Sequence, residues 1–244
     1  MPNSVYYDLH IHSCLSPCAE NDMTPGNIVG MAMLKGLNVV AITDHNSTLN
    51  CPAFFKFAGN FGIIPIAGTE ITTTEDIHVL TLFESLEAAM DFNSFIESKR
   101  IKIKNNSAIF GNQYVVDDQD NVECEHEFLL INSIDVSVDD ISDVVKNFSG
   151  IAIPAHVDKE ANGIVSILGT IPDNGFHSYE VFNSEKVDEI SERFPITKNG
   201  KIITNSDAHY LWDINEKNNY IELISDLSDV KSVTQELFSY LRGE

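Results

Sequence analysis

The sequence predicts a mixed α/β domain built on a largely parallel sheet. Apolar runs typical of strands alternate with helical patterns over the first third of the 244-residue chain, which favours βαβ units. The chain is 43% apolar, enough for a sizeable core, and its length suits one barrel or large α/β domain. Histidines and carboxylates stand beside the strand-like runs, mostly near their ends. We therefore expect residues 1–244 to form a single domain.

The first half of the chain should contain strands and helices in alternation. Thr24 reads as an N-cap and Pro25 as the first residue of a helix that stops near Gly36. A short helix follows around residues 54–60, and another covers about 85–104. The expected strands are 5–12, 38–45, 62–71 and 78–83.

The second half begins with a break in this rhythm. Residues 105–136 are polar, carry Asp and Asn turn signals, and are expected to form an insertion with a hairpin. A helix should resume over 139–148, and a C-terminal amphipathic helix over about 228–242. The expected strands of this half are 151–158, 178–183 and 201–209.

Composition limits the partners and the compartment. Acidic residues outnumber basic ones by 37 to 15, for a net charge of −22, so we expect no extended nucleic-acid duplex as a partner. A small anionic substrate stays possible, because bound divalent cations reverse the local sign of the field. The N-terminus does not resemble a signal peptide, no apolar run has the length of a membrane span, and the four cysteines have no CxxC spacing. We therefore expect a cytoplasmic chain with reduced thiols and no membrane partner.

Six of the eight histidines lie within or beside strand-like runs. In a barrel of parallel strands, the C-terminal strand ends and the loops that follow form the active-site face. Six imidazoles on one such face are hard to explain as packing. These residues are His10, His12, His45, His78, His156 and His209. The remaining two, His126 and His177, lie apart from any ligand pattern.

Carboxylates accompany these histidines in a pattern typical of metal sites. His10 and His12 are two residues apart, so both rings leave the same face of a strand and can share one ion. Asp44 precedes His45, Asp207 lies two residues before His209, and Glu70 ends the third strand. Imidazole nitrogens with carboxylate oxygens suit Zn, Mn or Fe. Their number exceeds what one tetrahedral site needs, which indicates two or three divalent metal ions.

Several other catalytic classes are excluded by missing motifs. The chain has no GxGxxG or GxxxxGK[ST] sequence, so nucleotide-binding loops of those types are absent. It also has no GxSxG element from which a serine hydrolase triad could be built.

The segments DLHIHS, ITDHN, GTEIT, IPAHVD and NSDAH resemble, in this order, the motifs of the PHP (polymerase and histidinol phosphatase) superfamily. The resemblance runs from Asp8 to about His209. It implies a distorted (β/α)7 TIM-like barrel, a site of two or three metals, and phosphoester hydrolysis by a metal-activated water. The implied substrates are a small phosphomonoester, a nucleotide or the end of a short oligonucleotide.

The resemblance also implies a role for each motif residue. The first metal would be held by His10, His12, Glu70 and Asp207, with Glu70 bridging to a second metal held by His78 and His156. His45 and His209 would hold a third. Asp8 and Asp44 would stand behind the ligands and orient them. Asp207 and His209 are the candidates for proton transfer, and Lys159 could touch a phosphate.

One segment departs from the family pattern. Relatives often carry a His or Asp a few residues after the HxH motif, as a ligand to the third metal, whereas this chain has Ser16-Pro17-Cys18 there. Glu20, Asp22 or Cys18 could substitute, and a two-metal enzyme is the alternative.

Two other functions compete with a phosphoesterase. The first is a metal-dependent amidohydrolase, because such barrels also present HxH and Asp at strand ends, although they usually carry a lysine where Glu70 stands. The second is a non-catalytic metal-binding module of a larger assembly.

Overall fold

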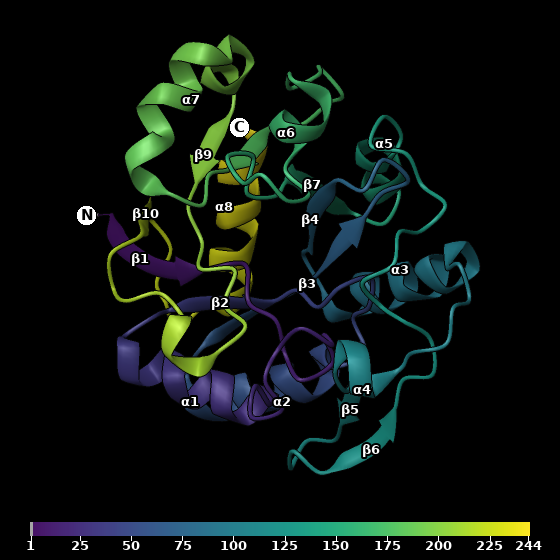
Figure 1. The fold of residues 1–244 in the computed structure, drawn as a ribbon. Coiled ribbons are helices and arrows are strands. Elements are labelled where there is room, and N and C mark those ends of the chain that lie inside the picture. The colour runs from purple at the N-terminus through teal and green to yellow at the C-terminus, as the bar shows by residue number, and fades with distance from the viewer. Residues whose placement is uncertain (1) are drawn as a thin grey trace.

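A curled sheet of six strands forms the centre of the molecule (Figure 1). The computed structural model describes residues 2–244. A parallel two-stranded pair, β8 and β9, stands beside this sheet, and an antiparallel hairpin, β5 and β6, lies away from it. The sheet order is β10 (Tyr220–Leu223), β1 (Asn3–Asp8), β2 (Val39–Ile42), β3 (Ile64–Thr72), β4 (His78–Phe83) and β7 (Gly150–Pro154). The other strands are β5 (Tyr114–Val116), β6 (Val122–Glu125), β8 (Ser178–Glu180) and β9 (Lys201–Ile203).

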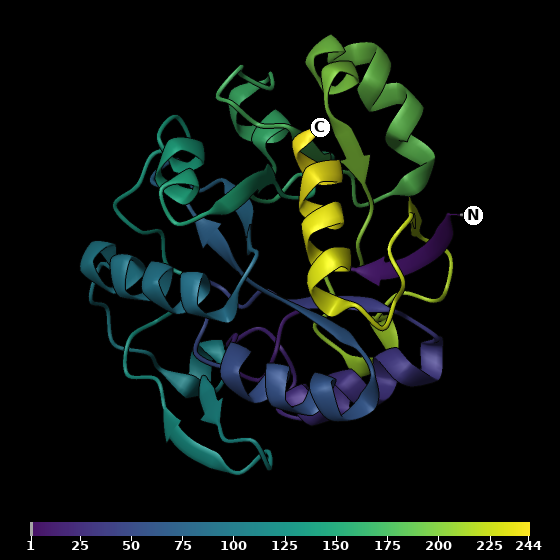
Figure 2. The same ribbon diagram turned by 180° about the vertical axis from the view of Figure 1, so that it is seen from behind.

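Helices surround the sheet on most sides (Figures 1 and 2). They are α1 (Pro25–Lys35), α2 (Cys51–Phe61), α3 (Leu86–Lys99), α4 (Ser107–Phe110), α5 (Ile141–Lys146), α6 (Ile164–Leu168), α7 (Val187–Arg193) and α8 (Val230–Arg242). Short 3-10 turns cover Ser184–Lys186, Pro195–Asn199 and Leu211–Asp213. No helix within residues 2–244 is long and apolar enough to cross a membrane.

Strand directions decide how far the sheet is a parallel barrel. β1, β2 and β3 run parallel, but β4 is antiparallel to both β3 and β7, and β10 is antiparallel to β1. The mixed α/β class is thus confirmed, whereas the (β/α)7 count of the expected distorted barrel is not. The reason is local: only a short turn joins β3 to β4, and a parallel crossover needs a dozen residues or more.

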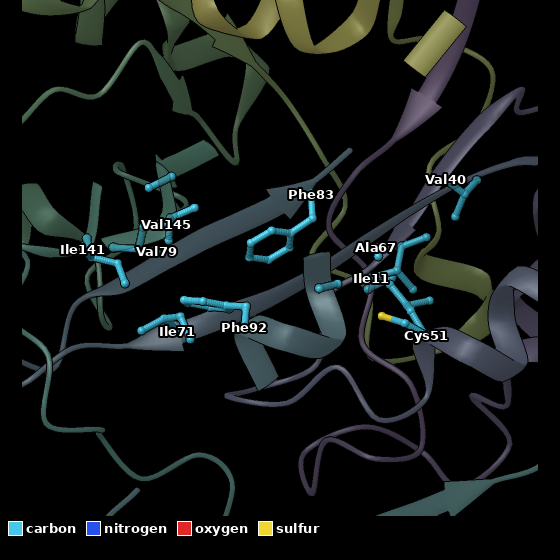
Figure 3. Packing of buried hydrophobic residues seen from close by; sticks show 14 of the residues in the cluster. Ile11, Val40, Cys51, Ala67, Ile71, Val79, Phe83, Phe92, Ile141 and Val145 are labelled. Atoms are coloured by element: carbon cyan, nitrogen blue, oxygen red, sulfur yellow. The ribbon is translucent and has the colours of Figure 1, made fainter. Parts of the chain in front are cut away.

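Alternation along the strands creates two apolar layers. On one face, Val5, Tyr7 and Leu9 belong to a buried cluster that α8 completes with Leu237 and Phe238. Figure 2 shows α8 lying across the back of the molecule over this face. The other face packs against α1, α2, α3 and α5, and Figure 3 shows part of this layer.

Helix ends follow the expected signals. The Thr24 side chain accepts a hydrogen bond from the Asn27 amide, Pro25 opens α1, and Gly36 closes it with a positive φ of 73°. The helix expected to reach residue 104 ends earlier, at Lys99, because Arg100 is already extended and bridges to Ile134. Four elements of the second half, α4, α6, α7 and β10, are additional to those expected from the sequence.

Residues 105–136 contain α4 and the β5–β6 hairpin. The hairpin docks against the start of α1, where Asp120 accepts hydrogen bonds from the Thr24 hydroxyl (2.6 Å) and the Gly26 amide (3.2 Å). Its first strand also reaches the loop after β1, because the Tyr114 amide donates to the Cys14 carbonyl over 2.9 Å.

Candidate metal centre

The six strand-end histidines, Glu70 and Asp207 meet at one edge of the sheet. Along β3, Ile64 and Ile66 face the α8 side, and Glu70 continues the same two-residue alternation. This face of β3 thus carries apolar side chains in the core and a carboxylate at the end of the strand. β2 ends in the same way, since an isolated bridge pairs His45 with Glu70.

His78 reaches this edge from the opposite direction. It is the first residue of β4, and the antiparallel register places it beside Thr72, at the end of β3. Its ring nitrogen Nδ1 is 2.9 Å from Glu70 Oε1. The start of the antiparallel strand β4 therefore places a histidine at the same edge of the sheet that the parallel strands reach with their ends.

Four ligand-type side chains form one group around the first strand. His10 Nε2 lies 3.2 Å from His12 Nε2 and 3.3 Å from Asp207 Oδ1. The distance from His12 Nε2 to the same Asp207 oxygen is 3.1 Å. Both imidazoles also lie 3.4 Å from a Glu70 oxygen. One cation could contact all four residues, because their ligand atoms lie within 4.8 Å of one another.

A second group uses the same glutamate. His45, Glu70 and His78 form a set with the same spacing. His156 adjoins this set, with Nε2 3.0 Å from Glu70 Oε1 and 3.3 Å from His78 Nδ1. Glu70 is thus the carboxylate that joins the two groups.

The third group consists of His12, His45 and His209. The expected partners His45 and His209 are therefore brought together, with His12 as the third member. None of Glu20, Asp22 and Cys18 belongs to any ligand group found within residues 2–244. His126 and His177 lie elsewhere: His126 contacts the Phe128 carbonyl and Glu97, and His177 lines a separate hollow with Leu241.

Partners behind the histidines determine which ring nitrogen faces the centre. His10 Nδ1 lies 3.0 Å from both oxygens of Glu180, and a hydrogen bond donated there leaves Nε2 free for a metal. His209 Nδ1 is 2.9 Å from the Asp207 carbonyl, with the same consequence.

His12 is oriented through a relay. Its Nδ1 is 3.0 Å from the Ser16 hydroxyl, which donates to Asp44 Oδ1 over 2.7 Å. Asp44 also accepts from the Ser13 amide and hydroxyl, over 2.7 and 2.6 Å. Asp44 thus contacts His12 only through Ser16, and its orienting role stays a prediction.

Asp8 supports the centre from another side. Its two oxygens accept from the amides of Ser206 (3.1 Å) and Asn215 (3.0 Å), so it fixes both ends of the loop that carries Asp207 and His209. The sequence motif around Asp8 does not reveal this function, because the contact joins residues about 200 positions apart.

Glu180 is a residue of the site that sequence reasoning missed. It is almost fully buried (1% exposed) at the end of β8 and accepts hydrogen bonds from the His156 amide (2.9 Å) and the Asn205 side chain (2.8 Å), besides facing His10. Asn205 in turn accepts from the Leu9 amide over 2.8 Å. An acidic residue inside the otherwise apolar run SYEVF was the available signal, since a buried carboxylate requires partners.

Strained backbone accompanies the ligands. His156 and Asp207 have positive φ values of 29° and 51°, and Asn46, next to His45, has 46°. Non-glycine residues adopt such angles at a cost of about 1–3 kcal/mol, and they gather at functional sites. The positive φ angles beside these side chains therefore support a functional site at this edge of the sheet.

The residues present fit divalent cations. His45 Nδ1 and Glu70 Oε2 are buried and only 3.1 Å apart, yet neither has a hydrogen-bond partner within residues 2–244. A buried polar atom without a partner is costly, and a shared cation would satisfy both atoms at once. The donor set of imidazole nitrogens and carboxylates suits Zn, Mn or Fe.

Charge coupling inside the cluster is strong. Burial disfavours the charged form of Glu70, but neighbouring His78 and His10 outweigh this and hold its pKa well below the usual range. Burial likewise opposes protonation of His10, yet Glu180 and Asp207 raise its pKa well above its ordinary value. His45 is different, because burial and the adjacent His12 both lower its pKa. Without metal, protons on His10 and His12 thus offset the carboxylates.

The metal-free protein should therefore lose stability as the pH rises from about 6.5 to about 9. Burial lowers the pKa of His12, but Asp207 and Glu70 outweigh it and raise that pKa from 6.5 to about 9. A group with a raised pKa stabilises the fold fully below its unfolded pKa and loses that contribution as pH passes the folded pKa. His45 and His209, whose pKa values are lowered, are neutral in the folded state over this window and in the unfolded state above about pH 7.5, so above that pH they do not change the stability.

Thermal unfolding with excess chelator across this pH range measures the effect. One pKa unit corresponds to about 1.4 kcal/mol, and about 1 kcal/mol moves the Tm of a chain of this size by about 2–4 °C. We expect Tm to fall by several degrees in chelator, and the increase in Tm on adding Mn²⁺ to grow with pH because metal replaces protons. A Tm in chelator that stays flat over the range would contradict this charge assignment.

Comparison with known proteins gives one family. The model of the PHP domain matches residues 8–169. An uncharacterized protein of Methanocaldococcus jannaschii, MJ1587, is 34% identical over 116 residues, which cover 44% of this chain and 67% of that protein.

Solved structures share the fold at low identity. A putative metal-dependent phosphoesterase from Bifidobacterium adolescentis superposes with a TM-score of 0.62 at 17% identity, covering 98% of this chain and 97% of that one. The lesion-specific endonuclease Q from Pyrococcus furiosus gives a TM-score of 0.64 at 17% identity over 99% of this chain. This chain spans only 56% of the length of that endonuclease.

The predicted exclusion of an extended nucleic-acid duplex is wrong. Endonuclease Q has been seen in complex with a 27-mer duplex substrate that carries an abasic lesion at the active site, and its chain superposes on this one with a TM-score of 0.53 at 19% identity. The prediction relied on the net charge of −22. A chain-wide charge does not describe the field at a site, where bound cations are the largest local charges.

Proposed function

We propose that this chain, which belongs to the PHP domain family, is a hydrolase that cleaves phosphoesters at the buried histidine–carboxylate cluster with two or three divalent cations. Members of this family are metal-dependent hydrolases. One observation carries the proposal: Glu70 joins two groups of ligands within 4.8 Å spacing. Two cations about 3.5–4 Å apart suit the displacement of a phosphoester oxygen.

We assign the first cation to His10, His12, Glu70 and Asp207, and the second to Glu70, His78 and His156, with His45 beside them. A third would use His45 and His209, with His12 adjoining. Bound divalent cations in such a site polarise phosphoryl oxygens and lower the pKa of water. The protein itself contributes the fixed ring orientations, through Glu180 at His10 and Ser16 at His12.

Two residues border the reacting group. His209 is the more exposed, with 24% of its side chain accessible, and burial together with His12 lowers its pKa to about 4. Its Nε2 is therefore unprotonated at neutral pH, and when only the first two cations are bound it can accept a proton. Asp207 is a poorer acceptor, because His10 and His12 outweigh its burial and lower its pKa, and Lys159 Nζ donates to its Oδ2 over 2.5 Å. We therefore assign Asp207 a ligand role and His209 the proton transfer.

The amidohydrolase alternative finds less support in the site. Such enzymes usually bridge their metals with a lysine, and Glu70 occupies that place. The neighbouring Lys159 contacts the outer oxygen of Asp207 instead. A solved amidohydrolase from Chromobacterium violaceum shares the fold, with a TM-score of 0.55 at 15% identity. Amides and lactones therefore belong in the substrate panel.

Metal content and hydrolysis of p-nitrophenyl phosphate should be measured on one sample purified without chelator. We expect at least two equivalents of metal, turnover that is lost on chelation, and recovery with Mn²⁺ or Zn²⁺. A second panel should contain nucleotides, single-stranded and duplex DNA, amides and lactones. Less than one equivalent, with no turnover after metal is added, would instead indicate a non-catalytic metal-binding module.

A further inference from the structure

Beside the metal cluster, an exposed aromatic ring separates two hollows. Phe182 follows β8, and the residue is 43% exposed. One hollow is lined by Lys159, Phe182, Asp207 and His209, and thus opens onto the ligands. The other is lined by Lys159, Phe182, Asn183, Ser184 and Lys186 together with Asp158 and Glu160. Each has a volume of about 530 Å³, within the usual size for small-ligand sites.

The backbone that carries the ring is held by Asp158. Asp158 accepts hydrogen bonds from the backbone amides of Phe182 (2.7 Å) and Asn183 (3.0 Å). Asp158 lies two residues after His156, so the turn that carries a ligand also fixes the position of the aromatic residue. An exposed phenylalanine whose backbone is tied to the site is a prepared surface rather than a loose loop side chain.

Lys159 links the ring to the cluster. Its Nζ lies 3.8 Å from the centre of the Phe182 ring and 2.5 Å from Asp207 Oδ2. The ammonium covers part of the ring and brings a positive charge to the side where a phosphate would approach the metals. Phe182 is nevertheless 43% exposed, so part of the residue stays accessible to a ligand.

The charges of the outer hollow indicate what such a ligand carries. Lys159 and Lys186 are balanced by Asp158 and Glu160, so the lining has no excess positive charge for a second phosphate. Phe182 supplies its only aromatic surface, and Asn183 and Ser184 supply hydrogen-bonding groups. A neutral, flat ring with polar edges suits this combination better than a phosphate or a bare sugar.

We propose that Phe182 and Lys159 form a specificity subsite, in which Phe182 stacks on the nucleobase of a nucleotide whose phosphate lies at the metal cluster. This inference rests on the proposed function and names its substrate class. Stacking of a base on an aromatic side chain changes affinity by about tenfold or more. The subsite therefore predicts a preference for nucleotides over base-free sugar phosphates.

The test compares adenosine 5′-monophosphate with ribose 5-phosphate, which has a hydroxyl at C1 in place of the base. We expect kcat/KM to favour the nucleotide by about tenfold, and the Phe182→Leu variant to lose most of this preference through KM. Phe182→Tyr should retain it. Phe61→Leu is the matched control, since Phe61 is a phenylalanine of α2 with similar exposure (52%), and it should keep the wild-type ratio.

A binding measurement separates this inference from the proposed hydrolysis. Fluorescence of 2-aminopurine riboside 5′-monophosphate should be quenched on binding to the Mn²⁺-treated protein, and less so for Phe182→Leu. Base-dependent binding without turnover would uphold the subsite and overturn the hydrolase. Turnover with the same substrate ratio in wild type and Phe182→Leu would uphold the hydrolase and overturn the subsite.

Discussion

Replacing Glu70 with glutamine is expected to abolish turnover and to remove metal while leaving the chain folded. Glu70 is completely buried and lies 2.9–3.4 Å from five histidines, including His10 and His78. It is also the member shared by two groups of ligands. Glutamine keeps the shape but loses the negative charge, so neither cation retains its bridging ligand. A loss of several kcal/mol of transition-state stabilisation is on the order of a 1,000-fold fall in rate.

The matched control is Glu75→Gln, the same substitution in the turn between β3 and β4. Glu75 accepts hydrogen bonds from Ser137 (2.7 Å) and the Val138 amide (2.9 Å) and is not a member of the ligand groups. The Glu75→Gln variant should retain wild-type metal content and turnover. Near wild-type hydrolysis by Glu70→Gln with metal supplied would show that the assignment of the bridging ligand is wrong.

The variant also has a signature without metal. Glu70 is among the groups that raise the pKa of His10 and His12. Its neutralisation should therefore weaken the fall in Tm between neutral and alkaline pH in chelator. A variant that merely misfolded would lose its cooperative unfolding transition instead.

How much of the site the sequence could predict depends on how local each signal is. His10 and His12 follow β1 in one short segment, and Asp207 and His209 share one loop, so the two-residue spacing alone predicts that the members of each pair lie close together. Glu70 stands at the end of a strong apolar run. These residues carry their chemistry and their position in the same short motif, and the structure brings all of them together.

The direction of β4 was predictable only in part. An apolar run has the same pattern in either direction, so HVLTLF alone does not distinguish a parallel from an antiparallel strand. The connection did contain the information, because Thr73–Ile77 is too short for a parallel crossover. Recognising this would have placed His78 at the start of an antiparallel strand, beside the end of β3.

Contacts over long sequence distances explain what was missed. Glu180 lies in a strand of only three residues, which is too short to show a period, and its partner His10 is 170 positions away. Ser16 is the converse case: it is close to His12 in the sequence, but its importance comes from Asp44, 28 positions further on. Residues that orient the candidate ligands can be recognised only from tertiary contacts. The candidate ligands themselves can be recognised from their position beside an apolar run in the sequence.

Replacing Glu180 with glutamine tests this orienting function, and it is expected to weaken metal binding or turnover by about 10–100-fold. The Glu180 carboxylate lies 3.0 Å from His10 Nδ1. Burial raises the pKa of Glu180, but the neighbouring His10 outweighs burial and lowers this pKa below its usual value. Glutamine keeps one acceptor oxygen but can also present an amide group to Nδ1. The His10 ring would then no longer be held with Nε2 toward the cluster.

Two further variants separate orientation from stability. Glu180→Ala leaves three buried donors without their acceptor, from His10, His156 and Asn205, at about 1–3 kcal/mol each, so its Tm should fall well below that of Glu180→Gln. Glu185→Gln, the same change at an exposed position five residues later, should alter nothing. Metal titration and thermal unfolding of all three variants decide the matter. If Glu180→Gln binds metal as tightly as the wild type, His10 is held by the backbone and not by this carboxylate.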